Sequence, residues 1–428
     1  MTVRADARPR QRALILALER RGEDWEESLE ELARLAETAH VEVVGTVTQK
    51  RDQPDPVHFV GKGKAHELRQ TKGEAGAEVL LVDGDLRPTQ QRNLEEDSGM
   101  GVLDRTGLIL DIFAQRARSA EGKLQVELAQ LTYLLPRLTG KGTELSRLGG
   151  GIGTRGPGET KLETDRRRLR ERIRHLKKQV EQIAKRRSLE RRHRQEAGLP
   201  VVALVGYTNA GKSTLLNTLS GAGVFVEDSL FATLDPTIRR VQLPDGREIL
   251  AVDTVGFIRN LPHQLVAAFR ATLEEVVEAD VLVHLVDASH PQMADQTDAA
   301  RRVLAELGCA GKPTVMAYNK ADLVRDRQRL AELMARQEHA TAISATTGEG
   351  LPELLRLVSE RLEQSLVPIA LTLPWAAQDL LSEVHQRGRV LSEQFQEQGV
   401  ALSARVPADI AQRLQRAAGI AEPDESEW

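Results

Sequence analysis

The sequence has one cysteine, few aromatic residues and no long apolar run. Cys309 stands alone among 428 residues, which excludes an internal disulfide and points to a reducing compartment. No apolar run approaches the roughly 18 residues that a bilayer-spanning helix needs, and Met1 to Arg12 are charged rather than apolar. Aromatics make up 3% of residues, so base stacking should not dominate any contact with nucleic acid. We expect a cytoplasmic protein without stable membrane insertion, and with at most a peripheral membrane association.

The formal net charge of -4 hides a strong internal asymmetry. Asp165 to Glu196 contains 14 Lys or Arg and 5 Asp or Glu, a net charge of +9, so the remainder must carry -13 for the total to reach -4. A basic segment of this kind suits a partner with a dense phosphate surface, such as structured RNA. The alternative is that Arg166, Arg167 and Arg168 form only a solvated helix face.

The most informative stretch is Gly206 to Ser213, which reads G-Y-T-N-A-G-K-S and follows the apolar run Val201 to Val205. A buried strand that turns into such a loop is typical of a nucleotide-binding site. Successive backbone N–H groups cradle the phosphates, and the following helix presents its positive end to them. Lys212 would hold the outer phosphates and Ser213 a magnesium ion. For a lone match, the alternative is an ordinary glycine turn.

A second motif, D-T-V-G at Asp253 to Gly256, follows the strand-like run Ile249 to Val252. A carboxylate at a strand end can hold magnesium through water, and a residue without a side chain can approach the terminal phosphate closely. We therefore expect Asp253 to assist metal binding and Gly256 to contact the phosphate.

Two further motifs are expected to contact the base of the nucleotide. Asn319 to Asp322 reads N-K-A-D, and Ser344 to Thr346 reads S-A-T; both follow strand-like runs. The Asp322 carboxylate can accept hydrogen bonds from the N1 and amino N–H groups of guanine. Adenine lacks that donor pair, so it would leave the carboxylate unpaired. Four motifs in this order, each at the end of an apolar strand, predict a GTPase.

Periodicity divides the chain into parts. Strand-like runs alternate with helical patterns over residues 1–120, which predicts a small α/β domain. Residues 121–197 include Lys161 to Gln195, which has no proline or glycine, so we expect a helical hairpin with a glycine-rich tip and a basic helix. We expect a GTP-binding domain at 198–365 and a small α+β domain at 366–428. The predicted fold class is multidomain α/β, with a P-loop GTPase domain of mixed sheet flanked by helices.

Longer motifs carry a resemblance to one family. They are G-K-G-K at Gly61 to Lys64, D-R-T-G-L-I-L-D-I-F-A-Q-R-A at Asp104 to Ala117, G-K-L-Q-V-E-L-A-Q-L at Gly122 to Leu131, and R-L-G-G-G-I-G-T-R-G-P-G-E-T-K-L-E-T-D-R-R-R at Arg147 to Arg168. With the phosphate loop, they make residues 10 to about 365 resemble the HflX family of ribosome-associated bacterial GTPases. The last sixty or so residues match only in general pattern.

The resemblance implies binding to the large ribosomal subunit and its RNA, with GTP-regulated splitting or rescue of stalled ribosomes under stress. We expect the chain to be monomeric away from the ribosome. The same switches and basic surface would also serve a GTP-gated assembly factor, or an RNA chaperone or helicase, without splitting activity. A second nucleotide or RNA site at Gly61 to Lys64 is implied as well, although a helix start with solvated lysines is the simpler interpretation.

Two switch positions bear on hydrolysis. Thr233 matches the family's switch threonine, whose hydroxyl would bind magnesium and whose carbonyl would hold the attacking water; Thr237 is the alternative because the two lie close together. Phe257 stands where many regulatory GTPases carry a water-orienting glutamine. Because phenylalanine cannot hydrogen-bond a water, we expect slow intrinsic hydrolysis that the ribosome stimulates.

Asn209 is a candidate potassium ligand. Related GTPases with asparagine at this place use its side-chain oxygen to hold K⁺ near the phosphates, where the ion supplies positive charge. Asparagine is also a common turn residue, so a hydrogen bond within the loop is the alternative.

The predicted sites are therefore as follows. GTP binding is assigned to Gly206, Tyr207, Thr208, Asn209, Ala210, Gly211, Lys212, Ser213, Phe231, Ala232, Thr233, Leu234, Asp235, Asp253, Thr254, Val255, Gly256, Asn319, Lys320, Ala321, Asp322, Ser344, Ala345 and Thr346. Catalysis is assigned to Lys212, Thr233 and Gly256. Magnesium is assigned to Ser213, Thr233 and, through water, Asp253. RNA binding is assigned to Arg147, Arg155, Lys161, Arg166, Arg167 and Arg168.

Overall fold

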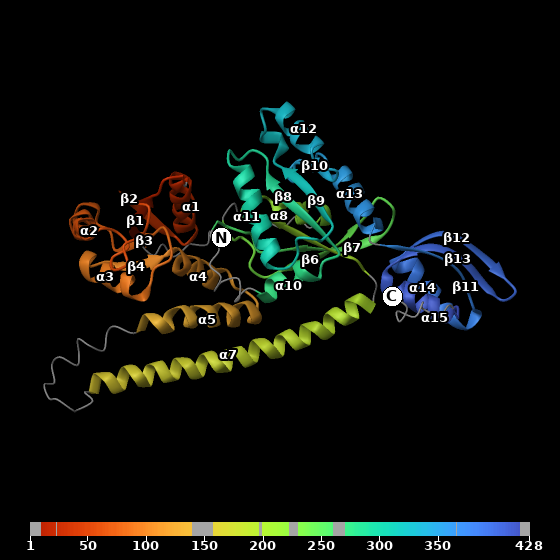
Figure 1. Cartoon of the computed structure of the whole chain (residues 1–428), viewed down its shortest axis with the longest axis horizontal. Helices are drawn as coiled ribbons and strands as arrows, with labels where there is room; N and C mark the ends of the chain where they lie inside the picture. The colour runs from red at the N-terminus through yellow and green to blue at the C-terminus, as the bar shows by residue number, and fades with distance from the viewer. Residues whose placement is uncertain are drawn as a thin grey trace, which may run out of the picture. The chain divides into compact units, whose positions relative to one another are not determined.

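The computed structural model describes residues 10–22, 24–138, 157–196, 199–221, 230–259, 270–364 and 366–419. The chain forms two compact units (Figure 1). The first unit comprises Met1–Ala184, Glu227–Asp235 and Arg259–Ala271, and the second comprises Lys185–Val226, Pro236–Ile258 and Thr272–Trp428. Among the helices described, none is long and apolar enough to cross a membrane.

The first unit is built on a parallel four-stranded sheet in the order β2-β1-β3-β4. Its strands are β1 (Gln11–Glu19), β2 (Val41–Lys50), β3 (Val79–Val82) and β4 (Gly101–Asp104). Residues Ala13 to Ala17 of β1 are each at most 1% exposed. An inner strand of a parallel sheet is covered on both faces, which is why this run is apolar throughout.

Four helices connect and extend these strands: α1 (Trp25–Thr38), α2 (Lys62–Ala75), α3 (Pro88–Ser98) and α4 (Arg105–Arg116). Asp24 caps α1 by accepting a hydrogen bond from the Glu27 N–H, and left-handed Gly76 ends α2. The G-K-G-K motif forms the beginning of α2, where Lys64 pairs with Glu67 at 2.9 Å. That geometry agrees with the simpler interpretation of the motif as a helix start.

Asp104 anchors the helices that follow. Its buried carboxylate caps α4 through the Gly107 N–H (2.8 Å) and accepts hydrogen bonds from Tyr133 Oη (2.7 Å) and the Arg137 guanidinium (2.9 Å). Tyr133 lies in α5 (Ala120–Leu134) and Arg137 in the 3₁₀ turn η1 (Leu135–Leu138). One carboxylate thus ties the end of the sheet to α4, α5 and η1.

The long helix α7 (Pro157–Glu196) runs beside α5 (Figure 1). Arg172 of α7 forms a two-pronged hydrogen bond with Glu127 of α5, at 2.7 and 2.9 Å. Ile173 and Leu176 on α7 are 9% and 0% exposed, so one apolar stripe is covered while the other faces carry charge.

The second unit contains a six-stranded sheet in the order β10-β9-β8-β5-β7-β6, in which only β6 is antiparallel to its neighbour. Its strands are β5 (Val201–Gly206), β6 (Thr237–Gln242), β7 (Glu248–Asp253), β8 (Val281–Asp287), β9 (Thr314–Asn319) and β10 (Ala340–Ala342). The accompanying helices are α8 (Lys212–Ser220), α10 (Arg270–Glu278), α11 (Met293–Glu306), η2 (Ala321–Leu323), α12 (Arg327–Ala335) and α13 (Leu351–Gln364).

The same unit ends in a three-stranded antiparallel sheet, β11-β13-β12, which has its own apolar core with two helices. The elements are β11 (Val367–Leu373), η3 (Trp375–Ala377), α14 (Gln378–Arg387), β12 (Arg389–Gln396), β13 (Gly399–Val406) and α15 (Ala408–Ala417). The order of strand, helix, strand, strand and helix is that of a small α+β domain.

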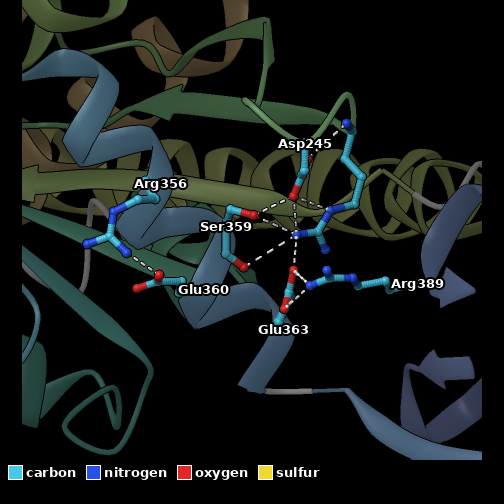
Figure 2. Close-up of polar contacts among 7 residues, drawn as sticks. Asp245, Arg356, Ser359, Glu360, Glu363 and Arg389 are labelled. Carbon is cyan, nitrogen blue, oxygen red and sulfur yellow. Dashed lines mark hydrogen bonds and ion pairs between the residues drawn. The ribbon is translucent and has the colours of Figure 1, made fainter. Parts of the chain in front are cut away.

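A polar network joins the β6–β7 turn to α13 and β12 (Figure 2). The Arg247 guanidinium donates to Asp245 at 2.6 Å and to Ser359 Oγ at 2.8 Å, and Arg389 donates to Glu363 at 2.6 Å. Burial by itself would raise the pKa of Asp245, but hydrogen bonds from Arg247 and Ser359 outweigh it and hold this pKa at about 2. The charged carboxylate therefore persists at every physiological pH.

The fold class predicted from sequence is confirmed: an α/β domain with long helices precedes a mixed-sheet P-loop domain, and a small α+β domain follows. The domain boundaries stay a prediction. β4 (Gly101–Asp104) could not be recognised from the sequence, because only Val102 and Leu103 in it are apolar.

Candidate nucleotide-binding site

The phosphate loop follows β5, which lies between β7 and β8 in the six-stranded sheet. The loop therefore emerges at the carboxyl edge of the sheet, where open α/β folds bind ligands. Gly211 adopts a left-handed φ of 94°, and a Cβ there would come closer than 3.0 Å to the side-chain amide of Asn319. Only glycine suits this position, because the loop backbone passes directly against the base-side motif.

Lys212 begins α8, and no described side chain caps that helix N-terminus. The residue is 6% exposed, and its ammonium donates to the carbonyl oxygens of Tyr207 (2.8 Å) and Gly206 (3.2 Å). Burial lowers the pKa of Lys212 to about 8, while the negative charge of Asp253 acts in the opposite direction. A buried cation beside an uncapped helix N-terminus is complementary to a polyphosphate.

Ser213 and Asp253 meet across the site. Ser213 Oγ donates to Asp253 Oδ2 at 2.7 Å, and Asp253 ends β7 with 2% exposure. Hydroxyl and carboxylate oxygens are ligands that Mg²⁺ accepts, so this pair fits the ion. The described residues contain no cluster of three His, Cys, Asp or Glu side chains that could hold a metal. Phosphate oxygens and water would have to complete the coordination.

The D-T-V-G segment returns to the phosphate loop. Thr208 N–H donates to the Phe257 carbonyl at 2.7 Å, and Phe257 N–H donates to the Gly206 carbonyl at 3.1 Å. A Cβ on Gly256 would lie 2.8 Å from Thr208 Cα and 3.0 Å from Lys212 Nζ. Gly256 thus lies against the residues expected to hold the phosphates. The Phe257 ring is 1% exposed, so this position packs in the core and offers no polar group to a water.

Asn319 connects the base-side loop to the phosphate loop. Its Nδ2 donates to the Ala210 carbonyl at 2.7 Å, and its Oδ1 accepts from the Ala345 N–H at 2.9 Å. Lys320 has a left-handed φ of 60° and pairs with Asp287 at 2.7 Å. Asp322 is exposed in η2, where it is accessible to a base.

The structure therefore assembles four of the predicted motifs in the second unit: the phosphate loop, Asp253 to Gly256, Asn319 to Asp322, and Ser344 to Thr346. Residues Phe231 to Asp235 belong to the first unit, in which Thr233 is half-buried. The individual roles assigned to these residues stay predictions.

The predicted RNA-binding residues are only partly described. Arg147 and Arg155 lie outside the described residues, as does the side chain of Lys161. Arg167 and Arg168 are exposed on α7, and Arg166 is half-buried.

Sequence reasoning missed two residues near the site. Asp287 ends β8 and pairs with Lys320; its position after residues 281–286, which are apolar except for His284, was an available signal. His284 lies inside β8 at 2% exposure, and burial lowers its pKa to about 3, helped by the positive charges of Arg301 and Lys212. It is a neutral core histidine, and nothing in the local sequence distinguishes it.

Four family descriptions match the chain in succession. "GTP-binding GTPase N-terminal" matches residues 26–114, "GTP-binding GTPase Middle Region" 116–194, "50S ribosome-binding GTPase" 201–320 and "HflX C-terminal domain" 329–428. Together they span nearly all of the described structure.

Individual relatives are similar over almost their full length. GTPase HflX of Caldanaerobacter subterraneus subsp. tengcongensis is 48% identical over 408 residues, which cover 95% of this chain and 94% of that protein. GTPase HflX of Escherichia coli is 46% identical over 383 residues, 89% and 90% of the two chains. Among solved structures, a GTP-binding protein from Sulfolobus solfataricus in complex with GDP is 26% identical, with a TM-score of 0.44 over 83% of this chain and 99% of that chain.

Proposed function

We propose, since this chain belongs to the HflX family of GTP hydrolases, that its GTP state controls binding to the large ribosomal subunit and the splitting or rescue of stalled ribosomes. The observation that carries this proposal is a nucleotide site of four connected motifs in a chain that also presents a basic helix, α7. The description "50S ribosome-binding GTPase" for residues 201–320 supports the choice of partner.

We assign the chemical roles as follows. Lys212 and the N-terminus of α8 bind the β- and γ-phosphates, and Gly256 approaches the γ-phosphate with its backbone. Mg²⁺ would be held by Ser213 and, through water, by Asp253, and would neutralise charge that develops on the phosphates. Thr233 would hold the ion with its hydroxyl and the attacking water with its carbonyl.

Intrinsic hydrolysis is expected to be slow. Phe257 is buried and cannot orient a water, so the residue after Gly256 contributes no polar group to the nucleophile. We propose that docking on the large subunit orders the segments around Thr233 and thereby accelerates hydrolysis.

Guanine selectivity is assigned to Asp322. Its carboxylate is accessible, and Asn319 fixes the adjoining loop through Ala210 and Ala345. A rigid loop keeps the carboxylate where the two guanine N–H groups can reach it, and discrimination follows from the unpaired acceptor that adenine would leave.

Potassium binding at Asn209 is a separate proposal. Asn209 has a left-handed φ of 61°, which asparagine tolerates, and its side chain is exposed. The turn alone would account for the residue type, whereas the exposed amide is accessible to a cation. Hydrolysis rates in potassium and sodium salts decide between the two, and equal rates would remove the proposal.

The RNA contact is assigned to α7. Among the described residues, Arg166 pairs with Glu163 at 3.9 Å and Arg168 with Asp165 at 3.8 Å, both on the same helix. Ion pairs as long as these contribute little stability, so exposed Arg168 can turn to a phosphate at small cost, and half-buried Arg166 can do so by breaking one long pair. Binding through phosphates should weaken steeply as salt rises.

Sedimentation of intact ribosomes tests the proposal. Incubation with the protein and a non-hydrolysable GTP analogue should convert the ribosome peak to separate subunits, with the protein in the large-subunit fraction. Lys212→Ala is the matched control, because it removes phosphate binding and should leave the ribosome peak intact. Binding without any loss of that peak would instead favour an assembly factor or RNA chaperone.

A further inference from the structure

Asp235 caps a helix that lies far from it in the sequence. Its Oδ2 accepts hydrogen bonds from the backbone N–H groups of Arg118 (3.0 Å) and Ser119 (2.8 Å), and its Oδ1 accepts one from Ser119 Oγ. Ser119 is the N-cap of α5, and its Oγ in turn accepts from the Gly122 N–H at 2.8 Å. All of these residues belong to the first unit.

The site is shaped for a carboxylate. Three donors converge on Asp235 at the positive end of α5, where a negative charge is most stabilising. A Cβ on Gly122 would come closer than 3.0 Å to Asp235 Oδ1, so the first turn of α5 leaves space for the carboxylate only because residue 122 is glycine. The contact depends on glycine at position 122 and on the carboxylate at position 235, which argues for a specific contact.

A second contact fixes the other end of the same segment. The Phe231 ring meets the Phe113 ring of α4 edge to face, with centroids 4.6 Å apart and planes at 68°. Both rings are at most 2% exposed. Phe231 has a φ of 55°, a strained conformation for a bulky residue, which persists only where the surroundings impose it. Residues 231 to 235 are therefore held at both ends by α4 and α5.

A similar contact is made three residues after the end of the D-T-V-G motif. Arg259 pairs with Glu27 of α1 at 2.8 Å, and both side chains are mostly buried, at 19% and 14% exposure. Within the first unit, α5 therefore contacts Asp235 and α1 contacts Arg259.

We infer that Asp235 is a positioning residue that couples the nucleotide state to helix α5, and through α5 to the basic helix α7. The inference rests on the role proposed above for Thr233. Two residues span at most about 7 Å of chain, so Thr233 cannot move far toward or away from a nucleotide without pulling on the Asp235 cap. The Glu127–Arg172 contact then passes a change in α5 to α7. Linkage is reciprocal. If the bound nucleotide changes the affinity of α7 for a partner by some factor, that partner changes the affinity for the nucleotide by the same factor.

Hydrogen exchange of the full-length protein tests the inference. In the wild type, the amides of Arg118 and Ser119 should exchange at different rates with GDP and with a non-hydrolysable GTP analogue. Asp235→Asn replaces an anion by a neutral amide, so these amides should exchange roughly tenfold faster than in the capped wild-type state. In Asp235→Asn, the amides of Arg118 and Ser119 should also exchange at the same rate with GDP as with the GTP analogue. Asp326→Asn is the matched control, because Asp326 caps α12 through the Arg329 N–H at 3.0 Å and should not affect α5.

Two results would overturn the coupling: equal exchange with both nucleotides in the wild type, or a nucleotide-dependent difference that survives in Asp235→Asn. Ser119→Ala removes one of the three donors to Asp235 and should weaken the coupling, whereas Ser119→Thr should preserve it, since threonine keeps the capping hydroxyl. Thr233→Ala tests the proposed function separately by its GTP hydrolysis rate. A wild-type rate in Thr233→Ala removes the role of Thr233, whereas a persisting exchange difference in Asp235→Asn removes only the coupling.

Discussion

The side-chain amide of Asn319 donates to the carbonyl oxygen of Ala210 at 2.7 Å, which ties the base-side loop to the phosphate loop. The contact is buried, and Gly211 beside it leaves no space for a side chain. The loops predicted to recognise the base and the phosphates are therefore tied together.

Replacing Asn319 by alanine should weaken nucleotide binding. The change leaves the Ala210 carbonyl and the Ala345 N–H without their partner, at a cost of about 1–3 kcal/mol for each buried group. We expect affinity for fluorescent GDP to fall by at least about tenfold. Gln337→Ala removes a hydrogen bond to the hydroxyl of Tyr318, the residue before Asn319, and involves neither loop, so it should leave affinity within about twofold. Unchanged binding in Asn319→Ala would contradict the proposed link.

Asp322→Asn should change the base that is bound. Asparagine presents an amide N–H that matches the carbonyl of xanthine, where guanine has its amino group. Affinity for GDP should therefore fall by two orders of magnitude or more while affinity for XDP rises. Competition between the two nucleotides measures the change. Equal preference for GDP in variant and wild type would show that another residue reads the base.

Binding of GDP should depend on pH through Lys212. In the nucleotide-free protein, burial places the Lys212 pKa at about 8, below the ordinary value of 10.5. Phosphates raise this pKa, so affinity should stay level below pH 8 and decline as pH rises above it. For stability the sign is opposite: the unfolded state binds more protons between pH 8 and 10.5, so the nucleotide-free fold gains stability across that window. Lys212→Met should remove both slopes, and titrations that show the same slopes in this variant would contradict the assignment.

Asp104→Asn should destabilise the first unit. The carboxylate is 1% exposed and carries the cap of α4 together with the Arg137 ion pair. Removing its charge leaves a partly buried guanidinium without compensation, which costs about 3–5 kcal/mol in the free energy of unfolding. Denaturant titration should show this loss. By comparison, Glu353→Gln removes an exposed pair with Arg356 and should change stability by less than about 1 kcal/mol.

The sequence predicted the elements that its own periodicity marks. The apolar run Val201 to Val205 located β5. The stretch without proline and glycine, Lys161 to Gln195, lies within α7, but the helix begins earlier, at Pro157. The phosphate loop was readable because its chemistry depends on adjacent residues. The Asp235 cap was not, since its partner Ser119 lies 116 positions away and neither residue is unusual locally. Contacts of that kind depend on tertiary packing, which no local pattern encodes.

Co-sedimentation with purified large ribosomal subunits tests the central claim most directly. The protein should pellet with large subunits when it carries a non-hydrolysable GTP analogue and should stay in the supernatant with GDP. Arg166→Glu and Arg168→Glu together should reduce pelleting and flatten its salt dependence, because two phosphate contacts are lost. Pelleting that is the same with GDP, with the analogue and without nucleotide, or absent in all three, would contradict the claim that GTP state controls ribosome binding.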